Sequence, residues 1–204
     1  MFKICPSYYD ELERAVGDCA SLLDVGCGSN SAIKRIPKRA YSVGVDMFAP
    51  DLQKSREQNI HDEYHVMNVM DIEKKFKPGS FDCVVALDLI EHLDKNDGLR
   101  LISMLEKIAM KKVVIFTPNG FLPQKEDGNP YQLHRSGWTC KELSVLGYEV
   151  IGVNGFKLIR GEYAAPRFRP KRLWEFIAQL SQFYVRDHPR LAFQILCVKD
   201  NPAR

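Results

Sequence analysis

The residues best suited to chemistry lie in the segment DLIEHL (88–93), which directly follows the apolar run FDCVVAL. Asp88, Glu91 and His92 stand at positions i, i+3 and i+4, so a helix beginning here would present them on one face. A further histidine, His134, comes later, in a loop rich in Pro, Gly and Asn. Two carboxylates and two imidazoles suit either general-base catalysis or the binding of Mg²⁺, Mn²⁺ or Zn²⁺. A purely structural role also stays open, in which Asp88 caps a helix and the histidines make local hydrogen bonds.

A second group of residues predicts a binding site at the end of an earlier strand. The run SLLDVG leads into Asp24-Val25-Gly26-Cys27-Gly28, where two glycines allow a tight turn and a close approach of the backbone to a ligand. The dinucleotide fingerprint GxGxxG is incomplete, because residue 31 is serine. Asp24 brings a negative charge to this turn, which disfavours a pyrophosphate and favours a cationic or amino-bearing ligand.

Polar residues also follow the next two predicted strands. Asp46 ends the first of them, and a carboxylate at this place can accept hydrogen bonds from both hydroxyls of a ribose. Asn68 and Val69 end the second, and they offer an amide side chain and a backbone N–H that can read the edge of an adenine. Together with Asp24, these strand ends describe a site for an adenosine that carries an amino-acid tail.

The elements that must position these residues alternate along the chain. The spacing predicts strands at 21–26, 41–46, 63–69, 81–88 and 111–119 and helices at 7–19, 31–37, 49–59 and 95–110. Such alternation is typical of βαβ units and a parallel sheet, and strands this apolar are expected to be buried on both faces. A helix at 139–147 then precedes strands at 148–156 and 190–200, which can pair at the sheet edge. Between these two strands, 171–186 has apolar residues at helical spacing, which fits a helix packed on the sheet, a membrane-surface helix or a substrate lid.

Composition indicates an ordinary globular domain. The 204 residues are 45% hydrophobic and 27% charged, with a net charge of +3 that is too small to indicate nucleic-acid binding by itself. The segment 159–174 has five Lys and Arg residues against one acid, which fits either a solvated loop or an anion-binding patch. The six cysteines form no CxxC pair, and the sequence shows neither a signal peptide nor an apolar run near 18 residues. We therefore expect a reduced, cytoplasmic protein without stable membrane insertion.

The segments LLDVGCGSN, GVDMF, NVMDI and FDCVVALDLIEHL, in this order, resemble the class I S-adenosylmethionine-dependent methyltransferases over roughly residues 20–155. The resemblance implies an α/β, Rossmann-like fold: a seven-stranded, mostly parallel sheet with helices on both faces and an antiparallel C-terminal hairpin. We expect one methyltransferase domain over 1–204, with a leading helix (1–19), an acceptor loop (121–138) and a helical insertion before the last strand (157–189).

The resemblance also assigns S-adenosylmethionine as the cofactor and gives each strand end a role. The methionine part is expected at Asp24, Gly26 and Gly28, the ribose at Asp46, the adenine at Met47, Asn68 and Val69, and the sulfonium at Leu87 and Asp88. The chain departs from the common pattern at Asn30, where many members have a third glycine, and at Asn68, where aspartate is commoner.

On the acceptor side, the chain is similar to two methyltransferase groups, the ubiquinone-biosynthesis O-methyltransferases and the RNA 3′-end 2′-O-methyltransferases. Both have an acid-x-x-Glu-His motif and a later loop histidine that hold a divalent metal at the acceptor oxygens. This implies Asp88, Glu91, His92 and His134 as metal ligands, although Asp88 is one methylene shorter than the usual glutamate. The alternative is catalysis without metal, by Glu91 and a histidine, with His92 or His134 as general base.

The expected function is therefore methyl transfer to an oxygen of a small-molecule acceptor by in-line displacement. RNA 2′-O-methylation is the less favoured alternative, and a non-catalytic S-adenosylmethionine-binding protein is the third. Four loop residues, Tyr131, Gln132, Arg135 and Trp138, are expected to line the acceptor pocket. The pattern leaves the acceptor itself and the oligomeric state open.

Overall fold

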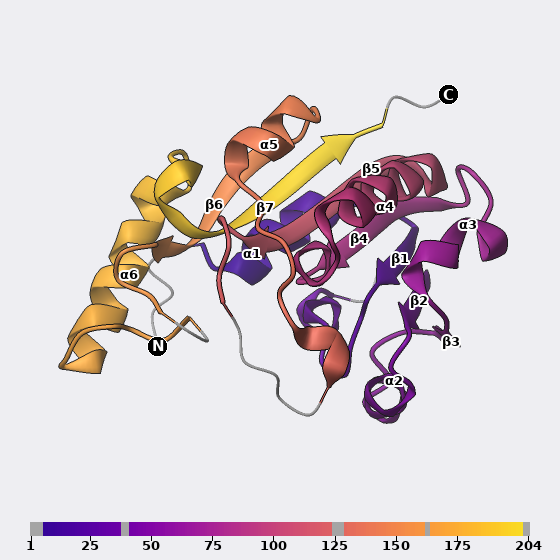
Figure 1. The fold of residues 1–204 in the computed structure, drawn as a ribbon, viewed down its shortest axis with the longest axis horizontal. Coiled ribbons are helices and arrows are strands. Elements are labelled where there is room, and N and C mark those ends of the chain that lie inside the picture. The colour runs from indigo at the N-terminus through magenta and orange to yellow at the C-terminus, as the bar shows by residue number, and fades with distance from the viewer. Residues whose placement is uncertain (1–5, 38–40, 124–128, 162–163, 202–204) are drawn as a thin grey trace.

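The structure, a computed structural model, describes residues 6–37, 41–123, 129–161 and 164–201. It contains one seven-stranded sheet in the order β3-β2-β1-β4-β5-β7-β6 (Figure 1). The strands are β1 (Ser21–Val25), β2 (Tyr41–Asp46), β3 (Glu63–Val66), β4 (Phe81–Leu87), β5 (Ala109–Pro118), β6 (Glu149–Phe156) and β7 (Ala192–Asp200). The first five are parallel, whereas β7 pairs antiparallel with both β5 and β6. The predicted fold, including its antiparallel C-terminal pair, is confirmed.

Helices cover both faces of the sheet. They are α1 (Tyr8–Val16), α2 (Ala49–Glu57), α3 (Ile72–Lys75), α4 (Lys95–Ile108), α5 (Cys140–Val145) and α6 (Lys171–Val185). One buried cluster joins the strands to α3, α4 and α5, and a second joins them to α1 (Figure 1). The helix α4 buries an apolar stripe against the sheet, formed by residues that recur at helical spacing: Leu101, Met104, Leu105 and Ile108.

Short 3₁₀ turns replace regular structure at three places where the sequence predicts a longer element. The helix predicted at 31–37 is a turn over Ala32–Arg35, and the strand predicted at 63–69 ends early, with Asn68 capping a turn over Val69–Asp71. The helix start predicted at 88–93 is a turn over Ile90–His92. All three turns follow the carboxyl end of a parallel strand, where the chain must change direction within a few residues.

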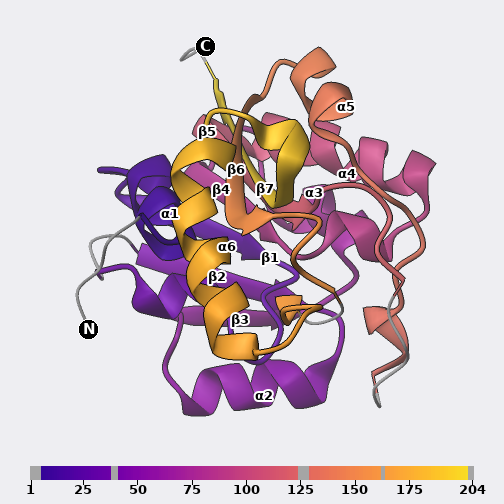
Figure 2. The same cartoon turned by 90° about the vertical axis from the view of Figure 1, so that its left-hand side faces the viewer.

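The helix α6 lies between β6 and β7 in sequence and packs against β6 (Figure 2). The C-terminal end of α6 lies close to the backbone of β6 at Gly152. The N–H of Gly152 donates to the Arg186 carbonyl, and its carbonyl accepts from the side-chain amide of Gln182. A Cβ on Gly152 would lie 1.9 Å from the Val185 carbonyl oxygen. Among the helices that the described ranges contain, none is both long enough and apolar enough to cross a membrane.

We predict that Gly152→Ala will destabilise the protein by about 3 kcal/mol, because the added methyl group must displace the backbone of α6. Urea unfolding monitored by circular dichroism measures this change. The matched control is Gln179→Ala, on the exposed side of the same helix, which should stay within about 0.5 kcal/mol of wild type. Equal stability of the two variants would contradict the close approach.

Candidate active site

The glycine-rich turn after β1 is fixed by the end of β2. The two strands are parallel neighbours, and the Asp46 carboxylate accepts from the Gly28 N–H and from the Phe48 N–H, each at 2.8 Å. Gly26 and Gly28 both have positive φ, and a Cβ on Gly26 would lie 2.6 Å from the Leu89 side chain. Desolvation raises the pKa of Asp46, and the two backbone hydrogen bonds oppose that shift. Gly26 is therefore required both by conformation and by space, whereas Gly28 is required by its conformation alone.

Asp24 lies beneath this turn and is completely buried. Its Oδ2 atom accepts from the Ser31 hydroxyl at 2.5 Å and lies 2.9 Å from Nε2 of His61. Its Oδ1 atom has no hydrogen-bond partner among the described residues, and neither does Nδ1 of His61. A buried carboxylate oxygen without a donor is costly, so this atom is suited to a ligand that brings a donor.

Sequence reasoning missed His61 and treated Ser31 only as an absent glycine. The signal for His61 lies in Gly44 of β2, because a Cβ there would come within 2.8 Å of the imidazole. Such a close approach between residues far apart in the sequence cannot be predicted from local pattern.

A cavity of about 260 Å³ opens at the carboxyl ends of β1 and β4. Five residues of the predicted cofactor site line this cavity: Asp24, Gly26, Gly28, Leu87 and Asp88. Other lining residues were not predicted, among them Tyr8 and Tyr9 of the leading helix α1. The ring of Tyr8 stacks on Phe116 of β5 with centroids 4.1 Å apart. The leading helix therefore contributes to the wall of this cavity.

The remaining predicted cofactor residues lie outside the lining of this cavity. Asp46 and Met47 follow β2, and Asn68 and Val69 follow β3, next to it in the sheet. Asn68 accepts from the Met70 N–H at 2.9 Å through its side-chain oxygen, which leaves its amide NH₂ available. Val69 is buried. Their assignment to ribose and adenine stays a prediction.

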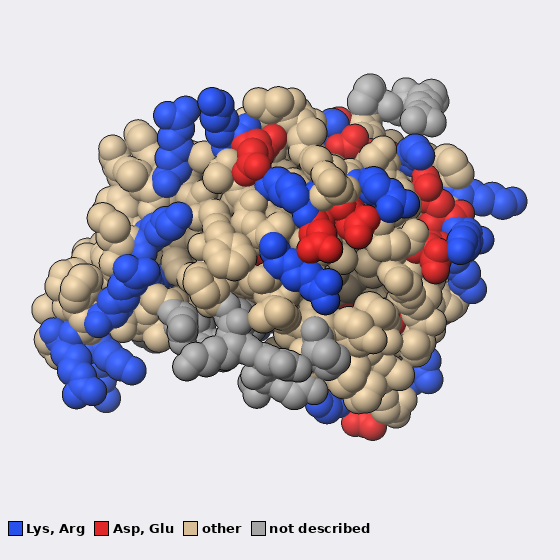
Figure 3. Space-filling view, in the orientation of Figure 1, with Lys and Arg blue, Asp and Glu red and all other residues tan. Residues whose placement is uncertain are grey.

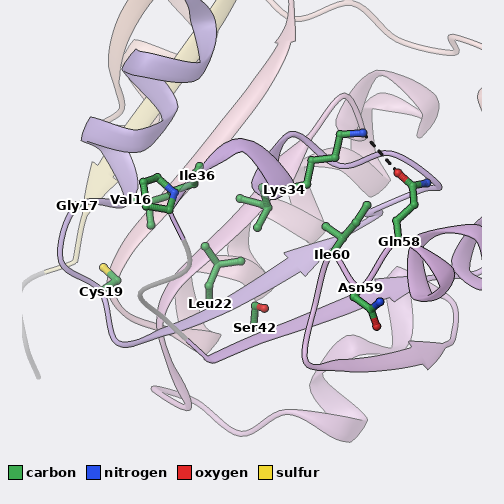
Figure 4. A pocket seen from close by; sticks show the side chains of 12 residues that line it. Val16, Gly17, Cys19, Leu22, Lys34, Ile36, Ser42, Gln58, Asn59 and Ile60 are labelled. Atoms are coloured by element: carbon green, nitrogen blue, oxygen red, sulfur yellow. Dashed lines mark hydrogen bonds between the residues drawn. The ribbon is translucent and has the colours of Figure 1, made fainter.

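A second cavity, of about 200 Å³, lies beside the first residues of β1 and β2 (Figure 4). Its walls are mainly apolar, with Val16, Leu22 and Ile60 among them, and Lys34 contacts Gln58 across it at 3.4 Å. None of the residues predicted from the sequence to act in binding or catalysis lines it. The cavity at the carboxyl ends of the strands is therefore the candidate active site.

The DLIEHL segment turns sharply instead of starting an α-helix. Asp88 has φ of 52°, in the left-handed region that aspartate tolerates better than most residues, and its N–H donates to the Phe116 carbonyl. The 3₁₀ turn that follows begins after Leu89 and has no side-chain cap. Two expectations are therefore wrong. Asp88 does not cap a helix, and it does not share an α-helical face with Glu91.

Glu91 is nonetheless brought close to Asp88. Its side chain is buried, and Oε2 accepts from the Thr117 hydroxyl at 3.0 Å, whereas Oε1 has no donor among the described residues. Desolvation raises the pKa of the buried Glu91, and the charge of Asp88 raises it further. Thr117, at the end of β5, was not predicted as part of the site.

The rings of His92 and His134 are in edge-to-face contact, with their centroids 4.8 Å apart. His134 donates from Nδ1 to the Leu122 carbonyl at 2.5 Å, a tautomer that leaves Nε2 with a free lone pair. Nδ1 of His92 is buried without a partner in the described parts of the chain. Desolvation lowers the pKa of His92 to about 4, helped by His134, and it also lowers the pKa of His134. Both rings are therefore neutral at pH 7 and can accept a proton or bind a cation.

Three of the four predicted metal ligands form a cluster. One ligand atom each from Glu91, His92 and His134 lies within 4.8 Å of the others. Asp88 is not in this cluster; its Oδ1 instead accepts from the Gln194 amide of β7 at 3.4 Å. Asp88 lies in the left-handed turn that precedes the cluster, and its side chain is hydrogen-bonded to β7.

The loop before α5 is tied directly to this turn. The backbone N–H groups of Arg135 and Ser136 donate to the Glu91 carbonyl at 2.8 and 3.0 Å. Gln132 lines the cavity, as expected of an acceptor-side residue, and Tyr131 is exposed. The expectation for Trp138 is wrong.

Trp138 belongs to the core. It is fully buried, its indole N–H donates to the Ile90 carbonyl at 3.1 Å, and its ring packs so close to Gly98 that a Cβ there would lie 2.5 Å away. It holds the loop onto α4 and has no contact surface left for an acceptor. A tryptophan in a polar loop suggests a binding residue, but here burial of its ring decides its place.

Known proteins share both the fold and part of the sequence. Residues 23–112 match the family model described as "Methyltransferase domain". The chain is 33% identical over 79 residues to the ubiquinone biosynthesis O-methyltransferase of Xanthomonas campestris pv. campestris, a match that covers 36% of this chain and only 33% of that protein.

Solved structures agree over nearly the whole chain. A SAM-dependent methyltransferase from Archaeoglobus fulgidus has a TM-score of 0.62 at 16% identity, with 95% of this chain and 92% of that chain covered. The magnesium protoporphyrin IX methyltransferase of Synechocystis PCC 6803, solved with bound SAM, has a TM-score of 0.54 at 14% identity, with 95% and 78% covered. These likenesses concern the fold.

The fold is Rossmann-like and of the kind found in S-adenosylmethionine-dependent methyltransferases. In sequence, residues 23–112 are similar to the methyltransferase domain, and the chain spans about a third of the length of the ubiquinone biosynthesis O-methyltransferases it matches.

We predict that His61 and Asp24 stabilise the fold as a pair. His61→Ala and Asp24→Asn should each lower the free energy of unfolding by about 1–3 kcal/mol, because each leaves a buried polar group without its partner. The double variant should lose less than the sum of the two. Chemical denaturation of all four proteins measures the coupling. His65→Ala, at a partly exposed ring, is the control, and additive losses would contradict the pairing.

Proposed function

We propose that the protein transfers the methyl group of S-adenosylmethionine to an oxygen of a small-molecule acceptor. One observation carries the proposal: the cavity that holds the glycine turn and Asp24 also reaches Asp88, which adjoins the Glu91–His92–His134 cluster. S-adenosylmethionine, when bound, supplies a methyl group already activated by the sulfonium. The residues of the chain need only bind, align and accept a proton.

The cofactor binds to acceptor and donor groups that make no other hydrogen bond, or keep a free lone pair, in the folded protein. The Oδ1 atom of Asp24 is the acceptor for the ammonium group of the methionine part. Each carboxylate oxygen of Asp46 accepts one backbone N–H and keeps a lone pair for a ribose hydroxyl. The amide NH₂ of Asn68 and the side chain of Met47 meet the adenine.

For the acceptor, the neutral histidines are the proton-accepting groups. The methyl group leaves sulfur and bonds to the acceptor oxygen, and the hydroxyl proton passes to Nε2 of His134 or to His92. General-base assistance of this kind contributes roughly 10²–10⁴-fold to the rate. Alignment of donor and acceptor in one closed site contributes more, up to ~7–11 kcal/mol.

A divalent cation is a second candidate for the acceptor side, and the donor set fits one. Glu91 Oε1 and His92 Nδ1 are buried without partners among the described residues, and the hydrogen bond from His134 to the Leu122 carbonyl orients its free Nε2 atom. Glu91, His92 and His134 would hold the ion, with Asp88 outside this set. Mixed nitrogen and oxygen donors suit Mn²⁺ or Zn²⁺ better than Mg²⁺. When bound, such an ion lowers the pKa of the acceptor hydroxyl.

The basic segment favours a small acceptor over RNA. Arg160 is buried and pairs with Glu175, so it is not available to a phosphate backbone. The positive residues that stay exposed lie at the start of α6 and do not line the cavity. A non-catalytic role is disfavoured because both the cofactor side and the acceptor side keep polar groups without partners.

We predict that Asp46→Asn will weaken S-adenosylmethionine binding about ten- to a hundredfold, because a charge-assisted hydrogen bond contributes about 1.5–3 kcal/mol. Titration calorimetry measures the affinity, and transfer of labelled methyl to a panel of hydroxylated acceptors measures activity. Glu57→Gln, on the neighbouring helix α2, is the control for loss of one negative charge. Unchanged affinity in Asp46→Asn, or no cofactor binding by the wild type, would contradict the proposal.

Calorimetry and EDTA treatment distinguish a bound cation from catalysis by a general base. If the site binds a cation, Mn²⁺ should titrate calorimetrically into the wild type and fail to do so in Glu91→Gln and His134→Ala, and EDTA should abolish transfer. His188→Ala, at an exposed histidine, should bind as the wild type does. If EDTA has no effect and His134→Ala loses roughly 10²–10⁴-fold in rate, the general base is the correct alternative.

A further inference from the structure

We propose that the exposed face of α6 docks on the surface of an anionic lipid membrane. The proposal concerns where the protein works, and it is independent of the proposed methyl transfer.

The observation that carries it is an apolar stripe on α6 that stays about half exposed, with its last residue, Tyr184, beside the rings of Phe156 and His188. Leu173, Phe176, Leu180, Phe183 and Tyr184 recur at helical spacing, and between 43% and 53% of each residue is exposed. Two leucines, two phenylalanines and a tyrosine on one face make an apolar surface of the kind that enters the boundary between head groups and acyl chains. Isolated exposed apolar residues are ordinary, but a continuous stripe along a whole helix marks an interaction surface.

The opposite face of the helix is already packed. Ala178, Ser181, Gln182 and Val185 are buried, and the Ser181 hydroxyl accepts from the Phe156 N–H of β6. A Cβ on Gly155 would lie 2.3 Å from the Ala178 carbonyl oxygen. The helix therefore cannot rotate to hide the stripe, and the fold presents it to the outside.

The charged residues next to the stripe indicate that its partner is anionic. Arg167, Arg169, Lys171 and Arg172 are exposed just before and at the start of α6. Figure 3 shows Lys and Arg side chains gathered at the lower left, over the end of this helix, beside uncharged surface. Cations next to an apolar helix face match the phosphates of anionic lipids, and each contributes to attraction near such a surface.

A second copy of the chain fits this face less well. The acids along α6 and at its end, Glu175 and Asp187, are already bonded to Arg160 and Arg186. In a dimer, the positive residues of each copy would therefore meet no unpaired acid on the α6 helix of the other copy. A lipid bilayer supplies both an apolar layer and a dense array of phosphates.

The position of α6 connects the surface to the active site. The helix packs on β6, which pairs with β7, and Gln194 of β7 contacts Asp88 at the edge of the cavity. The ring of Phe156, at the end of β6, lies 6.0 Å from that of Tyr184. Docking through α6 would hold the acceptor side of the sheet near the membrane.

Vesicle flotation tests the proposal with the full chain. The protein should float with vesicles of equal parts phosphatidylcholine and phosphatidylglycerol, stay unbound with phosphatidylcholine alone, and lose binding as salt rises. The variant Phe176→Glu/Phe183→Glu should reduce the bound fraction at least tenfold. Arg169→Gln/Arg172→Gln, which changes only exposed charges, should remove the preference for anionic vesicles.

Val145→Glu is the matched control, because Val145 is an exposed apolar residue on α5, away from the stripe, and its replacement should leave flotation unchanged. Thermal unfolding of each variant verifies folding without any need for activity. No binding to anionic vesicles, or equal binding to neutral ones, would overturn the proposal. A dimer in light scattering that Phe176→Glu/Phe183→Glu dissolves, without vesicle binding by the wild type, would show that a second copy is the occupant.

Discussion

The buried carboxylate of Asp24 is the constraint on which the site depends. It lies at the carboxyl end of a central strand, with no exposure to solvent, and is held by Ser31 and His61 through one oxygen only. Leaving the other oxygen without a donor is unfavourable for folding, so the surrounding packing must compensate. Gly44 gives His61 room to approach, and the glycine turn above is held by Asp46. Binding capacity is thus created by leaving one buried group incompletely satisfied.

The order of the strands explains why this group meets the DLIEHL turn. In the sheet, β1 lies between β2 and β4, so the chain leaves the carboxyl ends of β1 and β4 in opposite directions. Open α/β sheets form a crevice at such a switch point. Asp24 stands on one side of it and Asp88 on the other, and both line the same cavity. The left-handed turn at Asp88 is followed directly by the 3₁₀ turn that carries Glu91 and His92.

Sequence pattern predicted the sheet well because its signal is local and strong. The run Phe81–Leu87 is apolar enough to be identified as a buried strand, and α4 shows its stripe directly. The three 3₁₀ turns were harder, because a few residues at a strand end carry no periodicity. Trp138 and His61 were misjudged or missed for a different reason. Their roles depend on Gly98 and Gly44, residues that are distant in the sequence and whose missing side chains provide the space.

Asp88 lies between the cavity and the cluster of Glu91, His92 and His134. In its left-handed turn it contacts Gln194 and lines the cavity, and it is not a member of the cluster. The cluster then keeps one carboxylate, whose free oxygen faces two neutral imidazoles. A site with one carboxyl group and two nitrogen donors offers a cation fewer anionic ligands than one with two carboxylates, and a histidine that holds no ion can accept a proton. Under the proposed function, the absence of Asp88 from the cluster therefore favours proton transfer over a permanently bound cation.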